Sequence, residues 1–549
     1  RSDLKYRTLN RYLKLLEDAG IEDPLTVPAE QQKKTELEAR EKVRKQYDEY
    51  FERLKKETNK DHYDRYLNAF SRAFDPHTTY MPPQSKEDFD ISMRGSLEGI
   101  GATLREEDGY IKVVKVIPGS AAARQGQLSA DDVILAVAQG NEEPVDVTDM
   151  RLRDAVALIR GKKGTEVRLT LRRLGLKPFV VAIVRDVVVI EESFVKSVML
   201  TDPQSGNRYG YVKVPSFYRD FENTRDGGEG RNSTDDVKAA LETFNEKEMS
   251  GLILDLRNNG GGALTDAVGV AGLFLGEGPV VQVRNGGGDA KVLYSYNKQV
   301  AYHGPLVVLV NQFSASASEI VAGALQDYGR AVVVGSEHTH GKGTVQVIMD
   351  LDKSLTLRNM REFMPLGALK MTTQKFYRVS GDSTQYRGVI PDVILPDRSR
   401  YNEYGERYLD YSLPWDRIEE VEHKEWPPVD RAELNVKSQS RVAKDEDFIE
   451  IQRVAEAMGE RIKNTRQSLR INDVVQERND LLGMSTGPHG ATSSEIDEMD
   501  EEKQQPDDNR DATEILIETV LKDPYAKESM AILVDMAAQQ TVIAGKKHE

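Results

Sequence analysis

The spacing of apolar residues divides the chain into four regions. Residues 1–90 carry apolar side chains at helical spacing, as in LNRYLKLLEDAG, and predict a helical N-terminal region. Residues 96–185 carry short β-like runs, such as TEVRLTLRRL, around one helical stretch, and predict a small inserted domain. From 186 to 398, continuous apolar runs alternate with amphipathic helices, which is typical of a sheet covered on both faces. Residues 399–549 predict mainly helices, so the chain is expected to be an α/β multidomain protein.

Composition limits the partners of this chain. Residues 486–511 are acidic and have too little apolar content to fold, so we predict a disordered insert there. The whole chain of 549 residues has a net charge of −16, which argues against nucleic acid or an anionic membrane surface as a partner. No apolar run approaches the roughly 18 residues of a membrane-spanning helix. We therefore expect a water-soluble protein without a membrane span.

The chain has no cysteine, which excludes disulfides and thiolate metal sites. A reducing cytosol and a bacterial periplasm both suit such a composition. The sequence begins with Arg1 and has no apolar leader, so we expect a processed or shortened chain whose targeting signal would not be visible. Composition alone leaves the compartment open.

The segment NQFSASASEI, residues 311–320, places three serines at alternate positions between a predicted strand and a helix that begins near Ala317. The three serines are Ser314, Ser316 and Ser318. A strand-to-helix turn leaves helix N–H groups unpaired, so it can expose a nucleophile and supply oxyanion donors together. The alternative is that the serines only cap the helix, with Glu319 adding favourable charge in its first turn.

Two glycine-containing turns add to this segment. The stretch LDLRNNGGGAL, residues 254–264, ends a buried strand in three glycines, which leave backbone N–H groups bare for a substrate carbonyl. The stretch GSEHTHGKGTVQ, residues 335–346, places Lys342 between glycines after another strand. Taken singly, the first is better explained as a tight turn and the second as a surface hairpin with a solvated lysine.

Two other kinds of site fit the second turn poorly. A phosphate-binding loop needs four residues between its first glycines, but five separate Gly335 from Gly341, and Gly343 stands where Ser or Thr should coordinate magnesium. His338 and His340 would lie on one face of a strand as a metal pair, yet no third ligand is apparent nearby. Nucleotide and metal binding are therefore disfavoured.

Together these residues suit amide hydrolysis, because a lysine can take the proton of a serine when burial lowers its pKa. The order of SASASE, an upstream DLRNNGGG and a downstream GKGTVQ resembles the carboxyl-terminal processing proteases, and more closely their long tail-specific branch from Gram-negative bacteria. The stretches DPHTTYMPP, SLEGIGATL, YVKVPSFY and GVIPD extend the resemblance over most of the chain. It implies an α/β serine protease core with an inserted PDZ domain and helical terminal regions.

The family's site residues can be carried over by position. The resemblance implies Ser316 as the nucleophile and Lys342 as the general base. Gln346 matches a glutamine that orients the lysine amine, and the backbone N–H groups of Gly262 and Ala317 match the oxyanion hole.

Two positions need separate comment. Asp327 matches an aspartate implicated in the long branch, and a structural role at the end of its helix stays an alternative. The spacing from Ser316 to Lys342 is 342 − 316 = 26, one more than we expect for the family. An insertion before Gly341 would be absorbed in a loop, so it changes the shape of that loop more than the dyad.

The inserted domain resembles a PDZ domain, in which LEGIGA at 97–102 matches the loop that holds a peptide carboxylate. We expect the loop to contribute Leu97, Gly99, Ile100 and Gly101, and the helix DAVALIRG to contribute Val156 and Ile159 to the pocket for the last side chain. The alternative is a small structural β domain.

The resemblance thus implies a periplasmic serine endopeptidase without cofactor or metal, which captures protein substrates by apolar C-termini and cleaves them with a Ser-Lys dyad. A lipoprotein adaptor is a further implied partner. Two alternatives remain open. One is a tail-binding PDZ scaffold or holdase with an inactive dyad, and the other is a Ser-His hydrolase that uses His303, His338 or His340.

Overall fold

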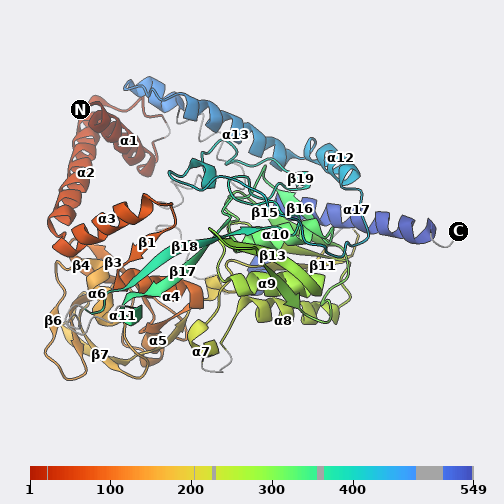
Figure 1. The fold of residues 1–549 in the computed structure, drawn as a ribbon. Helices are drawn as coiled ribbons and strands as arrows, with labels where there is room; N and C mark the ends of the chain where they lie inside the picture. The colour runs from red at the N-terminus through yellow and green to blue at the C-terminus, as the bar shows by residue number, and fades with distance from the viewer. Residues whose placement is uncertain (22, 203–204, 226–229, 355–363, 478–510, 547–549) are drawn as a thin grey trace.

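The computed structural model describes residues 1–549 except 22, 203–204, 226–229, 355–363, 478–510 and 547–549 (Figure 1). The predicted acidic insert lies outside the described residues except for Asp511, which caps a helix. Within the described part of the chain, no helix is both long and apolar enough to cross a membrane. The expected α/β multidomain architecture is confirmed.

A six-stranded sheet forms the centre of the α/β core. Its order is β10-β11-β12-β15-β16-β19, and every neighbouring pair is parallel except β10 with β11. The strands are β10 (Lys196–Thr201), β11 (Arg208–Lys213), β12 (Gly251–Asp255), β15 (Leu306–Val310), β16 (Val332–Gly335) and β19 (Val393–Ile394). All five residues of β12 and of β15 are buried, as their continuous apolar runs predict.

Helices cover both faces of this sheet, and the two layers come from different parts of the chain. One apolar cluster joins alternate strand residues such as Leu254 and Val308 to α8 (Ser233–Asn245), α9 (Leu264–Leu275) and α10 (Ala317–Asp327). The second cluster joins the opposite face to the C-terminal helices. These are α12 (Arg431–Val442), α13 (Glu446–Lys463), α16 (Ala512–Lys522) and α17 (Pro524–Lys546). The C-terminal region is therefore a layer of the core.

A second sheet, antiparallel throughout, extends from the core toward the N-terminal region. It has the order β1-β18-β13-β14, with β17 paired to β18. Its strands are β1 (Thr79–Met81), β13 (Glu277–Asn285), β14 (Lys291–Tyr296), β17 (Thr344–Asp350) and β18 (Ala368–Tyr377). Short elements α7 (Phe221–Arg225), α11 (Leu351–Ser354), η1 (Glu191–Ser193) and η3 (Glu406–Tyr408) lie in connections.

The inserted β domain, residues 96–189, has its own apolar core and a sheet of order β3-β4-β5-β7-β8, with β6 paired to β5. Its strands are β3 (Ala102–Glu107), β4 (Tyr110–Val116), β5 (Val133–Gln139), β6 (Val145–Asp146), β7 (Glu166–Arg172) and β8 (Phe179–Val184), and its helices are α5 (Ala121–Gln125) and α6 (Leu152–Ile159). The strands β2 (Ser96–Gly99) and β9 (Asp186–Val189) pair where the chain enters and leaves the domain.

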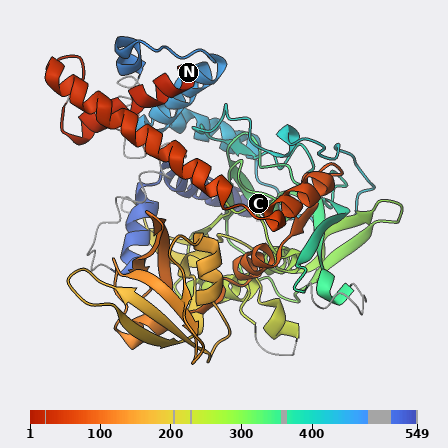
Figure 2. The same ribbon diagram turned by 90° about the vertical axis from the view of Figure 1, so that its left-hand side faces the viewer.

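The N-terminal helices are α1 (Ser2–Asp18), α2 (Ala29–Lys55), α3 (Asn59–Arg72) and α4 (Pro83–Arg94). Figure 1 shows α13 extending across the core toward α1, and Figure 2 shows α1 and α2 above the β domain drawn in orange. Asp61, in the first turn of α3, accepts hydrogen bonds from Arg151 (2.9 Å) and Arg153 of the β domain. This carboxylate, only 11% exposed, joins α3 to the start of α6.

Candidate active site

Ser316 lies in a sharp turn between β15 and α10. Its backbone has φ 56° and ψ −110°, a conformation that costs energy for a residue with a side chain and that is common where a reactive group must be exposed. Its side chain is partly exposed. The next residue, Ala317, begins α10, and its N–H donates to no described group. The turn therefore presents a hydroxyl beside a free backbone donor.

The two flanking serines have structural hydrogen bonds. Ser314 is fully buried, and its hydroxyl donates to the carbonyl of Leu256 at 2.8 Å. Ser318 is also fully buried, and its hydroxyl donates to the carbonyl of Asn259 at 2.8 Å. Both bonds attach the serine turn to the loop that follows β12. Ser316 is thus the one serine of the three whose side chain is accessible.

The glycine loop after β12 approaches Ser316 closely. A Cβ atom built on Gly261 would lie 2.9 Å from Ser316 Cβ, so a side chain there would collide with the turn. Asn259 holds the loop, since its Oδ1 accepts from Gly261 N–H at 2.8 Å and its Nδ2 donates to the carbonyl of Val214 at 2.8 Å. The N–H of Gly262 donates to no described residue. Gly262 and Ala317 therefore offer two unpaired donors on either side of the serine turn.

Lys342 lies in the segment between β16 and β17 and is partly buried. Burial, together with the positive charge of Lys370, lowers the pKa of Lys342 to about 8. The charges of Glu406, Glu319 and Asp75 oppose this shift. A lysine with this pKa is neutral in a substantial fraction of molecules near neutral pH and can accept a proton.

No hydrogen bond joins Ser316 Oγ to Lys342 Nζ or to any histidine in the part of the chain that the structure describes. His338 instead contacts the carbonyl of Thr339 through Nδ1 at 2.7 Å, and His303 is exposed on the surface. Burial lowers the pKa of His340 to about 4, and its ring packs on Tyr404. Residues 336–343 form no strand, so the expectation that His338 and His340 share one face of a strand is wrong.

Glu319 connects the segments of Ser316 and Lys342, a role that the sequence did not predict. Its carboxylate is fully buried, and Oε2 accepts from the backbone N–H of Ser316 at 2.7 Å and from that of Lys342 at 2.9 Å. The other oxygen accepts from Gly341 N–H at 2.7 Å and from the Thr339 hydroxyl at 2.6 Å. Burial raises the pKa of Glu319 to about 7 although these hydrogen bonds lower it. One buried carboxylate therefore fixes the backbone of both Ser316 and Lys342.

A second buried network holds the other side of Lys342. Gln385 accepts from Gly343 N–H at 2.8 Å and donates to Glu406 at 2.9 Å. Glu406, fully buried, also bonds His77 Nε2 at 2.8 Å. His77 belongs to the N-terminal region, so this region contacts the lysine segment indirectly. The sequence offered only the motif DPHTT as a signal for this connection.

Two expected catalytic residues face other partners. Gln346 Nε2 donates to the hydroxyls of Thr344 at 2.9 Å and Thr372 at 3.1 Å, and it makes no hydrogen bond to Lys342 among the described contacts. Asp327 ends α10, eleven residues after Ser316, and its carboxylate binds Arg378 at 3.0 and 2.5 Å. The geometry assigns Asp327 an ion pair that attaches the end of α10.

The β domain contains an open strand edge beside a helix. β3 pairs only with β4 among the described strands, and α6 lies beside it. Leu97 and Gly99 lie in β2, whereas the next two residues, Ile100 and Gly101, have backbone N–H groups that donate to no described residue. Gly101 has φ 80°, and a Cβ atom there would lie 2.1 Å from Ser120 Cβ. This loop can receive an anionic group.

The side chains near this loop differ in accessibility. Val156 of α6 is partly exposed, but Ile159 and Ile100 are each only 3% exposed and lie in the domain core. Val156 is thus the better-placed pocket residue of the two on α6. In the described chain, no group of three or more His, Cys, Asp or Glu residues could hold a metal ion.

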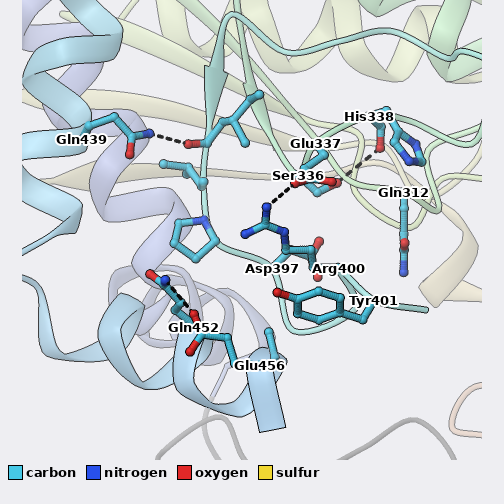
Figure 3. Close-up of a pocket in the computed structure, with 14 residues that line it drawn as sticks. Gln312, Ser336, Glu337, His338, Asp397, Arg400, Tyr401, Gln439, Gln452 and Glu456 are labelled. Carbon is cyan, nitrogen blue, oxygen red and sulfur yellow. Dashed lines mark hydrogen bonds and ion pairs between the residues drawn. The ribbon is translucent and has the colours of Figure 1, made fainter. Parts of the chain in front are cut away.

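A cavity of about 300 Å³ lies between the carboxyl ends of the core strands and the C-terminal helices (Figure 3). Its wall includes Gln312, His338 and Tyr401. Of the residues that the sequence singled out, His338 lines this cavity, whereas Ser316, Lys342 and Gln346 do not.

Comparison with protein families matches the whole order of domains. The matches are the tail specific protease N-terminal domain at residues 1–84, the PDZ domain at 89–172, peptidase family S41 at 208–395 and the C-terminal domain of tail specific protease at 399–538. Each match falls on a structural region described above.

Individual proteins give the same result. The chain is 39% identical to the tail-specific protease of Haemophilus influenzae over 81% of its own length, and it spans 62% of the length of that relative. It is 32% identical to the carboxy-terminal-processing protease of Bartonella bacilliformis, over 62% of this chain and 71% of that protein.

Two solved structures are also similar. One is a photosystem II D1 C-terminal processing protease, with 26% identity, 64% of this chain and 86% of that chain covered, and a TM-score of 0.35. The other is the PDZ domain of a carboxy-terminal protease from Vibrio cholerae in complex with peptide, with 43% identity, 17% of this chain and 97% of that chain covered, and a TM-score of 0.17. From the family matches and the sequence relatives, the chain belongs to the carboxy-terminal-processing and tail-specific proteases of peptidase family S41.

Proposed function

We propose that the chain is a serine endopeptidase in which Ser316 attacks a peptide carbonyl and Lys342 is the general base. The neutral amine of Lys342 takes the proton of the Ser316 hydroxyl as the Oγ–carbonyl bond forms. The oxyanion accepts hydrogen bonds from the N–H groups of Gly262 and Ala317. Lys342 then gives its proton to the leaving amine, and water hydrolyses the acyl-enzyme by the reverse proton transfers.

The observation that carries this proposal is the shared carboxylate of Glu319. It ties the backbone of a partly exposed, strained serine to the backbone of a partly exposed lysine whose pKa is lowered to about 8. A lone serine turn would be explained by helix capping. Capping does not require a lysine of lowered pKa on a second segment that is fixed to the same oxygen.

The same proposal includes recognition of substrate C-termini. The free N–H groups of Ile100 and Gly101 suit a terminal carboxylate, and the open edge of β3 can pair with the strand that ends in it. Val156 of α6 lies partly exposed beside this edge, so a small or apolar last residue would fit better than a charged one. Leu97, Gly99 and Ile159 support this groove from β2 and from the domain core.

A periplasmic location and a lipoprotein adaptor are part of the same proposal. Their support is the family resemblance, strengthened by the match of all four domain types in the order of the long tail-specific proteases. The finding that no described helix suits a membrane span is compatible with both.

One observation favours a second candidate, a tail-binding holdase with an inactive dyad. Ser316 Oγ and Lys342 Nζ are not hydrogen-bonded to each other in the described structure. The candidates differ in whether a tailed protein is cleaved or only bound.

The test is cleavage of an unfolded protein with an apolar C-terminal tail by the wild type and three variants. Ser316→Ala and Lys342→Ala should both abolish cleavage and retain binding, and Lys342→Arg should not rescue it because a guanidinium stays protonated. Ser440→Ala is the matched control, since it removes an exposed hydroxyl of α12 that bonds only the carbonyl of Val436 in the same helix.

Cleavage by Ser316→Ala equal to the wild type would refute the assignment of the nucleophile. Binding without cleavage by the wild type would favour the holdase. A combined replacement of His303, His338 and His340 that abolished cleavage, while Lys342→Ala remained active, would favour the Ser-His alternative.

A further inference from the structure

The cavity of about 300 Å³ lies at the carboxyl ends of the central strands, where the segments that carry Ser316 and Lys342 also begin. Figure 3 shows its lining residues. Gln312 follows β15, Ser336 follows β16 and Leu395 follows β19, so the carboxyl ends of three parallel strands form its floor. Helices α12 and α13 contribute the opposite wall, including Gln439, which donates to the carbonyl of Ile394 at 2.7 Å. Crevices at the carboxyl ends of parallel strands are common ligand sites.

One polar group in this wall lacks a partner. Gln312 is 5% exposed, and its Nε2 makes no hydrogen bond in the described structure. A buried donor without a partner costs about 1–3 kcal/mol, so such groups are retained where something else accepts the bond. The neighbouring glutamine in the cavity, Gln452, differs, because its amide donates to Glu456 at 3.0 Å.

An unused acceptor lines the same cavity. His338 Nδ1 lies 2.7 Å from the carbonyl of Thr339 and therefore carries the proton, which leaves Nε2 as a lone-pair acceptor. Gln312 and His338 thus present one donor and one acceptor. A peptide unit, with its carbonyl and its N–H, is complementary to this pair.

The charge of the cavity wall also limits which ligand can bind there. Its acidic side chains are Glu337, Asp397 and Glu456, against one arginine, Arg400, which is already paired with Glu337 at 2.8 Å. The excess of carboxylates disfavours a terminal carboxylate or a phosphate. An uncharged or basic internal stretch of polypeptide fits better.

The distance to the dyad is limited by the chain itself. Gln312 precedes Ser316 by four residues and His338 precedes Lys342 by four residues. Four residues span at most about 14 Å, which equals about four residues of extended peptide. A substrate chain in the active site can therefore reach the cavity.

We propose that this cavity is a subsite for an internal segment of the substrate polypeptide, within about four residues of the scissile bond, where Gln312 donates to a substrate backbone carbonyl. This inference rests on the proposed protease function. The subsite would hold the chain during cleavage, whereas the β domain holds its end.

The test compares Gln312→Leu with Gln452→Leu, two identical changes in the same cavity. Gln312→Leu should raise KM for a tailed protein about tenfold with little change in kcat, because a substrate carbonyl loses its donor. It should also leave the Tm equal to or above that of the wild type, because an unpaired buried amide is removed. Gln452→Leu should leave KM unchanged.

An unchanged KM in Gln312→Leu would overturn the proposal, and so would a Tm loss with the KM effect, which would indicate a structural role. A photocrosslinking amino acid in place of Ala455, in a Ser316→Ala background, gives a readout independent of turnover. Crosslinks should map within about four residues of the site that the wild type cleaves. Absence of crosslinks would refute the subsite, whereas a wild type that does not cleave would refute the protease function instead.

Discussion

Replacing Glu319 by Gln tests the central feature of the proposed mechanism. One Glu319 oxygen accepts from the N–H groups of Ser316 and Lys342, and the other accepts from Gly341 N–H and the Thr339 hydroxyl. A glutamine has one oxygen, so its NH₂ group must face one of these two pairs. If the oxygen stays on Ser316 and Lys342, the Thr339 hydroxyl can turn to accept from the glutamine NH₂ group. Gly341 N–H and the proton of that hydroxyl then lose their acceptor.

This cheaper orientation of the glutamine sets the expected magnitude. One buried N–H left unpaired costs about 1–3 kcal/mol, so we expect a Tm decrease of several degrees. If the lost hydrogen bond displaces the segment that carries Lys342, kcat should also fall roughly ten- to hundredfold. The charge matters separately. Above about pH 7 the wild-type carboxylate is ionised and raises the pKa of Lys342, so the variant should move the acid limb of kcat to lower pH.

The assay is kcat at saturating tailed substrate across the pH range, with thermal unfolding measured in parallel. The matched control is Glu528→Gln, a buried carboxylate bonded to Arg441 between the C-terminal helices at 2.7 Å. This control should lower Tm without moving the acid limb. If Glu319→Gln left both kcat and the acid limb as in the wild type, the carboxylate would have no role in positioning the dyad.

Three further predictions follow from the same groups. Below pH 8 the wild-type kcat should fall about tenfold per pH unit, because the proposed base is the neutral amine of Lys342. A kcat that stays constant between pH 6 and 8 would contradict this. Lys342→Met should raise the free energy of unfolding at pH 7 by on the order of 1–3 kcal/mol, because the folded state disfavours the charged amine of the wild type. This gain should shrink as the pH rises from about 8 to 10.5, where the amine becomes neutral in the unfolded state too. Measuring Tm of both proteins at pH 7 and pH 10 checks the sign. Amidating the substrate tail should slow degradation roughly ten- to hundredfold at limiting substrate, and equal rates for both tails would remove the Ile100–Gly101 loop from recognition.

The sequence predicted the strands of the central sheet because their burial is visible in their composition. β12 and β15 are continuous apolar runs, and only a strand buried on both faces tolerates such a run. Which segments cover the two faces of the sheet was harder to predict from the sequence. Periodicity shows that a face is apolar but not which segment covers it, so the role of α12, α13 and α17 as its second layer needed the structure.

The second sheet could not be assembled from sequence either. β1 contributes three residues from the N-terminal region and pairs with β18, almost 300 positions later in the chain. A strand of three residues has too short a pattern to recognise, and such a long-range pairing depends on the folded arrangement of both regions. The PDZ pocket presents the same limit on a smaller scale. Val156 and Ile159 are both apolar residues on α6, and only the structure separates the partly exposed one from the buried one.

The motif SASASE could be recognised from the sequence, but the roles of its individual residues could not. In SASASE, Ser314, Ser318 and Glu319 are all buried. Ser314 bonds the backbone of Leu256, Ser318 bonds that of Asn259, and Glu319 bonds that of Ser316 and Lys342. From the sequence, these residues could equally have served only to cap the helix. Glu319 fits that role too, because it lies in the first turn of α10. A carboxylate that merely caps a helix would have spare oxygens in solvent, but here both oxygens accept bonds from residues twenty or more positions away. The polar residues around Ser316 are therefore needed for geometry, and their replacement should impair turnover even though they do not contact the scissile bond.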